Sequence, residues 1–252
     1  MIKSIDLNCD LGESVAGIPM PNDAQLMDYV SSVNIACGFH AGDATTMAET
    51  VKIAVAKQVK IGAHPSFPDL QNFGRKEMNL PAKEVYDIVL YQIGALSGFV
   101  KAAGTKLHHV KPHGALYNMA AKDSQLAEAI AQAVFDFDPT LILYGLSGSK
   151  MIDAARQIGL RSAAEVFADR TYQNDGTLTP RNQENALITD SKLALAKVLA
   201  MVREQQVVTL DRKKINIQAQ TVCIHGDGPH AIAFAKMIFE SLTADGITLN
   251  LP

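Results

Sequence analysis

The chain lacks the features that mark a membrane protein, a nucleic-acid binder or a secreted protein. No apolar run reaches the length of about 18 residues that spans a bilayer. The net charge of -3 comes without a basic stripe, which argues against nucleic acid as a partner. Strand-like residues begin at Ile5 and leave no room for a signal peptide. We therefore expect a cytoplasmic protein that binds neither membranes nor nucleic acids.

Cysteine is scarce, and no nucleotide-binding loop is evident. The three cysteines, Cys9, Cys37 and Cys223, are odd in number, have no CxxC spacing, and lie within predicted strands or at their ends. They are typical of small buried residues in a reducing compartment rather than of nucleophiles or metal ligands. A P-loop and a kinase-like glycine loop are both missing, so the sequence shows no complete nucleotide site.

What is present is a regular alternation of short apolar strands and helical patterns over all 252 residues. The pattern predicts one domain, residues 1–252, with seven β/α units whose strands lie at 5–9, 33–36, 61–63, 107–110, 141–144, 162–167 and 221–224. A small hairpin is predicted outside this alternation, at 207–210 and 215–218. Seven units suit either an open doubly wound sheet or a barrel. We prefer a deformed (β/α) barrel, because polar strand ends occur both early and late in the chain rather than at one switch point.

The strand ends carry polar residues of the kinds that do chemistry. Six segments, starting at residues 6, 34, 61, 108, 165 and 223, read DLNCDLGE, NIACGFHAGD, IGAHPSFPD, HHVKPHGALYN, EVFADRTY and CIHGDGP. A parallel β/α protein gathers such strand ends on one face. The sequence therefore predicts a single site to which all six segments contribute.

In the first segment, Asn8 and Asp10 alternate along the strand and so share one face, and Glu13 follows at its end. The alternative is structural, with Asp10 and Glu13 capping a turn around Gly12. Because so many other strands are polar at the same position, we favour a functional role.

The next two segments add imidazoles and a long loop. His40 and Asp43 are candidate site residues, although Asp43 is also a plausible helix N-cap. His64 is a candidate too, or else a solvated loop histidine. The polar loop from residue 64 to residue 80 is long enough to be functional. In it, Arg75 and Lys76 either form a lid over a substrate phosphate or carboxylate, or are solvated charges.

The fourth segment is the densest cluster. Lys111 and His113 lie on one side of an extended stretch, and Gly114 allows close approach of the backbone. An ammonium and an imidazole directed into a partly dry pocket can hold an anion and transfer a proton.

The last two segments supply acids and a guanidinium. Arg170 can bind a carboxylate bidentately, or it forms an internal salt bridge with Glu165 or Asp169. His225 and Asp227 complete the set, and Asp227 is also well placed to cap the final helix.

Metal binding is the main alternative chemistry. Asp10, His40 and His64 have the right ligand types for zinc or a related ion, but no HxxxH or CxxC spacing supports such a site. We therefore expect no tightly bound transition metal.

The six segments, in this order and over almost the whole length, resemble the LamB/YcsF family. The resemblance implies a barrel similar to the glycoside hydrolase/deacetylase barrel, in agreement with the fold derived above. It also implies ATP-dependent hydrolysis of the lactam 5-oxo-L-proline (pyroglutamate) to L-glutamate, with Mg²⁺ accompanying ATP and with 5-oxoprolinase subunits B and C as partners. Asn72, Lys76, Asn185 and Gly228 depart from the family pattern, which bears on lid motion or substrate tolerance more than on the reaction.

For such a reaction we divide the candidates into two groups. The candidate acid, base and nucleophile-activating residues are Asp10, Glu13, His40, His64, Lys111, His113 and Asp227. The candidate substrate- or phosphate-binding residues are Asn8, Asp43, Arg75, Gly114, Glu165, Asp169, Arg170 and His225. Two other functions remain open: a metal-dependent amidase or deacetylase that acts alone, and a non-catalytic subunit that binds a small acid.

Overall fold

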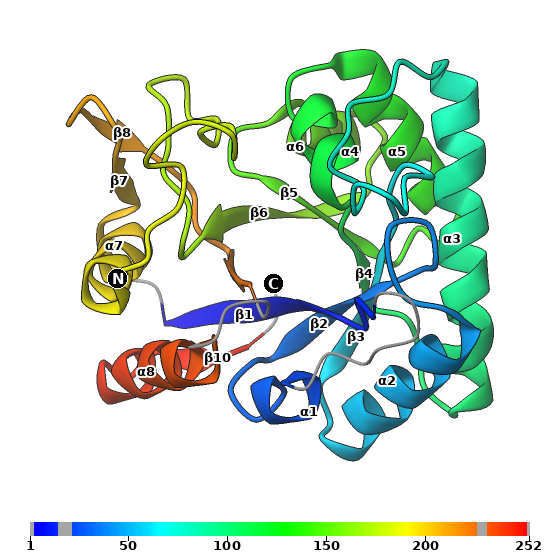
Figure 1. The fold of residues 1–252 in the computed structure, drawn as a ribbon, viewed down its shortest axis with the longest axis horizontal. Helices are drawn as coiled ribbons and strands as arrows, with labels where there is room; N and C mark the ends of the chain where they lie inside the picture. The colour runs from blue at the N-terminus through cyan, green and yellow to red at the C-terminus, as the bar shows by residue number, and fades with distance from the viewer. Residues whose placement is uncertain (1–2, 15–21, 226–230, 251–252) are drawn as a thin grey trace.

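A closed parallel barrel is the central feature of the computed structural model, which describes residues 3–14, 22–225 and 231–250 (Figure 1). Its strands are β1 (Ser4–Leu11), β2 (Ser32–Ala36), β3 (Lys60–His64), β4 (His109–Val110), β5 (Ile142–Leu146), β6 (Arg161–Phe167) and β9 (Thr221–Ile224). Neighbours pair in that order, and β1 also pairs with β9, which closes the ring. The predicted deformed (β/α) barrel with seven strands is confirmed.

Two small additions lie outside the ring. The strand β10 (Thr248–Leu249) pairs with the beginning of β1. The strands β7 (Gln206–Val208) and β8 (Lys214–Asn216) form an antiparallel hairpin, as predicted.

Helices surround the barrel, as Figure 1 shows. They are α1 (Asp23–Leu26), α2 (Ala44–Ala56), α3 (Ala82–Ala102), α4 (Gly114–Ala120), α5 (Ser124–Phe137), α6 (Lys150–Gln157), α7 (Ser191–Glu204) and α8 (Ala231–Ala244). Aspartates begin three of them, because the carboxylates of Asp43, Asp123 and Asp190 accept hydrogen bonds from otherwise unpaired N–H groups of the first turn. None of the described helices is both long and apolar enough to cross a membrane.

Two local predictions differ from the structure around residue 110. The fourth strand contains only His109 and Val110, where residues 107–110 were expected. The segment after it is not extended throughout, because the helix α4 begins at Gly114. The short helix was missed because its seven residues are too few to show a helical period.

Apolar side chains fill the space between the barrel and its helices, where one large buried cluster includes Leu7, Ile35, Val89, Leu96 and Val222. Six polar side chains fill part of the barrel's interior; we call Asp6, Ser32, Asn34, His109, Tyr144 and Thr221 the inner layer. All six are fully buried. A glycine makes room for the layer, since a Cβ on Gly62 would lie 2.1 Å from Nε2 of His109. The barrel is therefore stabilised from outside by apolar packing and from inside by hydrogen bonds.

Candidate active site

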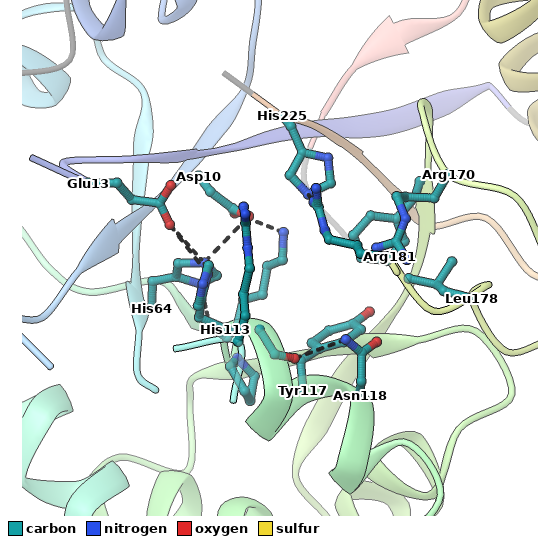
Figure 2. A pocket seen from close by; sticks show the side chains of 15 residues that line it. Asp10, Glu13, His64, His113, Tyr117, Asn118, Arg170, Leu178, Arg181 and His225 are labelled. Atoms are coloured by element: carbon teal, nitrogen blue, oxygen red, sulfur yellow. Dashed lines mark hydrogen bonds and ion pairs between the residues drawn. The ribbon is translucent and has the colours of Figure 1, made fainter. Parts of the chain in front are cut away.

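A pocket opens at the carboxyl ends of the strands, where the polar segments meet (Figure 2). Its cavity volume is about 50 Å³. The lining residues are Asp10, Glu13, His64, Arg75, Lys111, Pro112, His113, Gly114, Tyr117, Asn118, Phe167, Arg170, Leu178, Arg181 and His225. Residues far apart in sequence thus line one pocket, as expected for a β/α barrel.

Nine of the fifteen residues that we singled out line this pocket: Asp10, Glu13, His64, Arg75, Lys111, His113, Gly114, Arg170 and His225. His40 and Asp169 lie behind it and contact lining side chains. Asn8 and Glu165 lie beneath it, hydrogen-bonded to each other. Asp227 and Gly228 fall outside the described residues.

Asp43 is a correction to the sequence-based set. It is exposed, and its carboxylate accepts a 2.7 Å hydrogen bond from the Thr46 N–H at the start of α2. The residue does not line the pocket. Of the two roles that the sequence allowed, the structure supports the helix N-cap.

Lys111 is the centre of a buried ionic network. Its Nζ lies 2.8 Å from Oδ1 of Asp10 and 3.0 Å from Oε1 of Glu165, and its side chain is 2% exposed. Burial alone would lower the pKa of Lys111, but the negative charges around it outweigh burial and raise that pKa. The ammonium therefore stays charged and fixes the direction of both carboxylates.

Glu165 has few acceptor positions left for a substrate. Besides Lys111, its oxygens accept hydrogen bonds from Nδ2 of Asn8 at 3.0 Å and from the hydroxyl of Tyr117 at 2.7 Å. Asn8 in turn accepts from Nδ2 of Asn34 at 2.8 Å. We interpret Asn8 and Glu165 as supports of the pocket floor rather than as substrate ligands.

One side of the pocket is formed by Glu13, His40, His64 and His113, which we call the histidine wall. Oε1 of Glu13 lies 3.1 Å from Nε2 of His40 and 3.3 Å from Nδ1 of His113. The rings of His40 and His113 are stacked, with centroids 3.9 Å apart. Burial lowers the pKa values of both rings and raises the pKa of Glu13. The rings of His40 and His113 are therefore neutral near pH 7, and the raised pKa makes the Glu13 carboxylate a stronger proton acceptor than an ordinary one.

The long loop after β3 holds the histidine wall in place. Nε2 of His113 lies 2.9 Å from the carbonyl oxygen of Phe73. The loop approaches α4 so closely that a Cβ on Gly114 would lie 2.4 Å from the carbonyl oxygen of Gly74. Gly114 has a φ of +57° as well, so a side chain there would be strained. The glycine thus allows the close contact between the loop and α4, whereas its expected role in binding a substrate or phosphate stays a prediction.

The opposite side of the pocket is formed by Asp169, Arg170, Arg181 and His225, which we call the arginine wall. Nδ1 of His225 lies 2.9 Å from the Asp169 carboxylate, and Nε2 of His225 lies 3.1 Å from Nη2 of Arg181. Burial alone would raise the pKa of Asp169. The charge of His225 and its hydrogen bond to the carboxylate outweigh burial, so the pKa of Asp169 is lowered. The carboxylate therefore stays ionised and orients His225 toward Arg181.

Arg170 is nearly buried, at 4% exposure, and donates from Nη2 to the carbonyl oxygen of Thr179 at 2.5 Å. Its Nε has no hydrogen-bond partner among the described residues. Burial lowers the pKa of Arg170 to about 10, and the nearby charge of Arg181 acts in the same direction. Two guanidinium groups side by side, one with an unused donor, form a binding position for an anion.

Six lining residues are not among those singled out from the sequence: Pro112, Tyr117, Asn118, Phe167, Leu178 and Arg181. Tyr117 and Asn118 lie on α4, the unpredicted helix, and Leu178 and Arg181 lie in the irregular segment between β6 and α7. Arg181 had one signal, a cation in the polar stretch that follows a strand end.

The side chains that can share a metal ion differ from those suggested by sequence. Ligand atoms of Glu13, His40, His64 and His113 all lie within 4.8 Å of one another. The set considered from sequence was Asp10, His40 and His64, and Asp10 is not in this group. Its Oδ2 nevertheless lies 3.4 Å from Nε2 of His64.

Comparison with known proteins agrees with this arrangement. The model of the LamB/YcsF family matches residues 5–251. Over 252 residues the chain is 55% identical to the A-subunit of the 5-oxoprolinase from Bacillus cereus (strain AH187), and the match covers all of both chains. The crystal structure of a lactam utilization protein from Thermus thermophilus has a TM-score of 0.92 and 46% identity, covering 99% of this chain and 100% of that one.

A more distant likeness concerns the fold alone. The family 4 carbohydrate esterase from Streptomyces lividans has a TM-score of 0.52 and 12% identity, covering 99% of this chain and 92% of that one. The barrel thus has the same overall fold as that esterase. Because the family model spans nearly every residue, including all six polar segments, the chain belongs to the LamB/YcsF family.

Proposed function

We propose that this chain is the A-subunit of an ATP-dependent 5-oxoprolinase, which hydrolyses the lactam of 5-oxo-L-proline to give L-glutamate. The observation that carries the proposal is full-length identity of 55% with a protein of that name. The pocket fits the reaction, because it combines groups for proton transfer with groups for anion binding.

The reaction has three chemical requirements. A five-membered lactam is a poor electrophile, and phosphorylation of its carbonyl oxygen by ATP makes attack by water feasible. The site then needs donors for the phosphate, a base for the water and an acid for the ring nitrogen that leaves.

We assign the anionic groups to the arginine wall. Arg170, whose buried Nε has no hydrogen-bond partner among the described residues, lines the pocket together with Arg181, and Arg75 lines it from the loop. They are suited to the substrate carboxylate and to a transferred phosphoryl group, both of which guanidinium binds through paired N–H donors.

We assign the proton transfers to the histidine wall. Glu13, His64 and His113 line the pocket opposite the two arginines (Figure 2). Imidazoles and a carboxyl group with a raised pKa can take a proton from water and give one to the departing nitrogen. Asp10 and Lys111 position these groups from below and keep the pocket floor charged.

The full reaction needs components that this chain does not supply by itself. We propose that ATP binds with Mg²⁺, that subunits B and C complete the enzyme, and that the enzyme works in the cytoplasm, where ATP is available. The missing P-loop supports the need for partners, because a nucleotide site of known type is not evident in the sequence.

The test is release of glutamate from 5-oxoproline by the purified chain alone, by the chain with ATP, and by the chain with ATP and both partners. We expect turnover only in the last mixture. An Arg170→Ala variant in that mixture should raise KM for 5-oxoproline or ATP by at least about tenfold, the scale of one lost charged hydrogen bond. Robust turnover by the chain alone without ATP would contradict the proposal and favour a metal-dependent amidase. Glutamate formation in the complete mixture that is unaffected by Glu13→Gln and His113→Gln would favour a non-catalytic subunit that only binds the small acid.

A further inference from the structure

The hydrogen bonds on the outer nitrogens of His64 and His113 fix which nitrogen of each ring lacks a hydrogen when the ring is neutral. Nδ1 of His64 lies 2.7 Å from the carbonyl oxygen of Lys111, and Nε2 of His113 lies 2.9 Å from the carbonyl oxygen of Phe73. A carbonyl oxygen only accepts, so both of these ring nitrogens must be donors. In a neutral imidazole the other nitrogen then carries a lone pair and no hydrogen.

The two remaining nitrogens face each other. Nε2 of His64 and Nδ1 of His113 are 2.9 Å apart, which brings two lone pairs to hydrogen-bond distance with no hydrogen between them. Oε1 of Glu13 lies 3.3 Å from the His113 nitrogen and 3.7 Å from the His64 nitrogen. Three electron-pair donors therefore converge in a place where they repel one another unless a cation lies between them.

A single proton does not balance this arrangement. It can join the two rings from Nδ1 of His113, but Nε2 of His64 and Oε1 of Glu13 then compete as acceptors for one hydrogen. Oδ2 of Asp10 lies 3.4 Å from Nε2 of His64 and adds a fourth acceptor. A divalent ion can be shared by all the converging atoms, whereas a proton serves two.

The distances also suit a metal ion. A triangle with sides of 2.9, 3.3 and 3.7 Å has a circumscribed radius of about 1.9 Å, so a position exists about 2.1 Å from all three atoms, the usual length of zinc–nitrogen and zinc–oxygen bonds. Two imidazoles and one carboxylate form a donor set that suits zinc and similar transition metals, whereas Mg²⁺ prefers oxygen ligands alone. The carbonyl partners of both rings are the outer hydrogen bonds that orient metal-binding histidines.

From this geometry we propose that Glu13, His64 and His113 form a three-ligand site for a divalent transition-metal ion of the zinc type. His40 lies behind the site, where its Nε2, 3.1 Å from Oε1 of Glu13, positions the carboxylate. All three ligands line the pocket, so the ion has a coordination position open to a small molecule. The proposal rests on this chain's own geometry and not on the hydrolysis of a lactam.

The proposal runs against our expectation from sequence, which was based on the absence of a metal-binding spacing. The three ligands lie at or just after the ends of three different strands, β1, β3 and β4, and are 51 and 49 residues apart. Ligands brought together by a barrel have no characteristic spacing, so its absence does not argue against this site.

The experiment uses the purified full-length chain stripped of metal by a chelator and then dialysed. Zn²⁺ binding is followed by titration calorimetry and elemental analysis, and Co²⁺ by its visible absorption, which reports the ligand geometry. We expect one ion per chain. We also expect His64→Ala and His113→Ala each to weaken binding by at least about a hundredfold, since loss of outer hydrogen bonds alone costs 10- to 100-fold.

Two further variants keep the test decisive. Glu13→Gln is nearly isosteric and should weaken binding to the same extent even if an alanine variant does not fold. His108→Gln removes a histidine outside the pocket and should leave the affinity unchanged. Absence of Zn²⁺ and Co²⁺ binding, or equal affinity in the Glu13 and His113 variants and the wild type, would overturn the proposal. A proton shared by His64 and His113 in ¹⁵N NMR of the Zn²⁺-treated chain would overturn it in favour of the proton-bridged pair.

Discussion

The inner layer and the histidine wall are both buried and polar, yet they differ in how their hydrogen bonds are matched. In the inner layer the Asp6 carboxylate accepts from the hydroxyls of Ser32, Tyr144 and Thr221 at 2.6 to 3.0 Å. In the histidine wall, acceptors of Glu13, His64 and His113 face one another. Burial of polar groups therefore does not by itself mark a site in this barrel, whereas unmatched acceptors do.

His109 shows how complete the matching is in the inner layer. Its Nε2 donates to Oδ1 of Asn34 at 2.7 Å, because the Asn34 amide nitrogen already donates to Asn8 and Asp10. Its Nδ1 lies 3.2 Å from Nδ1 of His108, which can donate to it. Both nitrogens of His109 are therefore used, and we interpret the residue as structural.

The largest effect should come from Lys111, which lies between the two regions. Lys111→Met leaves the carboxylates of Asp10 and Glu165 buried without their cation, which should lower the free energy of unfolding by about 3–5 kcal/mol. Urea unfolding of the purified chain measures this. A matched control is Lys57→Met, which removes an ammonium paired with the exposed Asp28 and should cost less than about 1 kcal/mol. A similar decrease in the free energy of unfolding in both variants would show that the buried network stabilises the fold no more than an exposed ion pair does.

A smaller effect on stability should come from the inner layer when the pH is lowered. Burial lowers the pKa of His109 well below 6.5, so the folded protein keeps this ring neutral while the unfolded chain takes up a proton below pH 6.5. Stability should therefore fall as the pH falls below 6.5, by up to about 1.4 kcal/mol per pH unit from this residue. His109→Gln should reduce that slope in urea unfolding between about pH 7.5 and 5.5, a range that spans the ordinary pKa of histidine. An unchanged slope would mean that His109 is protonated in the folded state.

The strand alternation predicted the barrel, because parallel strands with polar ends have few other arrangements, and it predicted that Asp10, His64, Lys111 and Arg170 would meet. It did not separate supporting residues from lining ones. The alternation of side chains along β6 predicts the face on which Glu165 lies. It does not predict that the oxygens of Glu165 are already occupied by Lys111, Asn8 and Tyr117. Arg181 lies in an irregular segment, where neither period nor spacing gives a direction. An aspartate after a strand end can be either a site residue or a helix N-cap, so the sequence left both roles open for Asp43. Only the structure shows that it caps α2.

The measurement that tests the central claim most directly compares two histidines four residues apart, His109 in the inner layer and His113 in the histidine wall. Glutamate formation is measured in the complete enzyme with ATP and both partner subunits, after circular dichroism has shown that each variant is folded. Our account predicts that His113→Gln lowers the rate by at least about a hundredfold, the usual contribution of an acid–base group, while His109→Gln stays within a few-fold of the wild type. Equal losses in the two variants, or a near-normal rate for His113→Gln, would contradict the claim that unmatched acceptors of the histidine wall carry the chemistry.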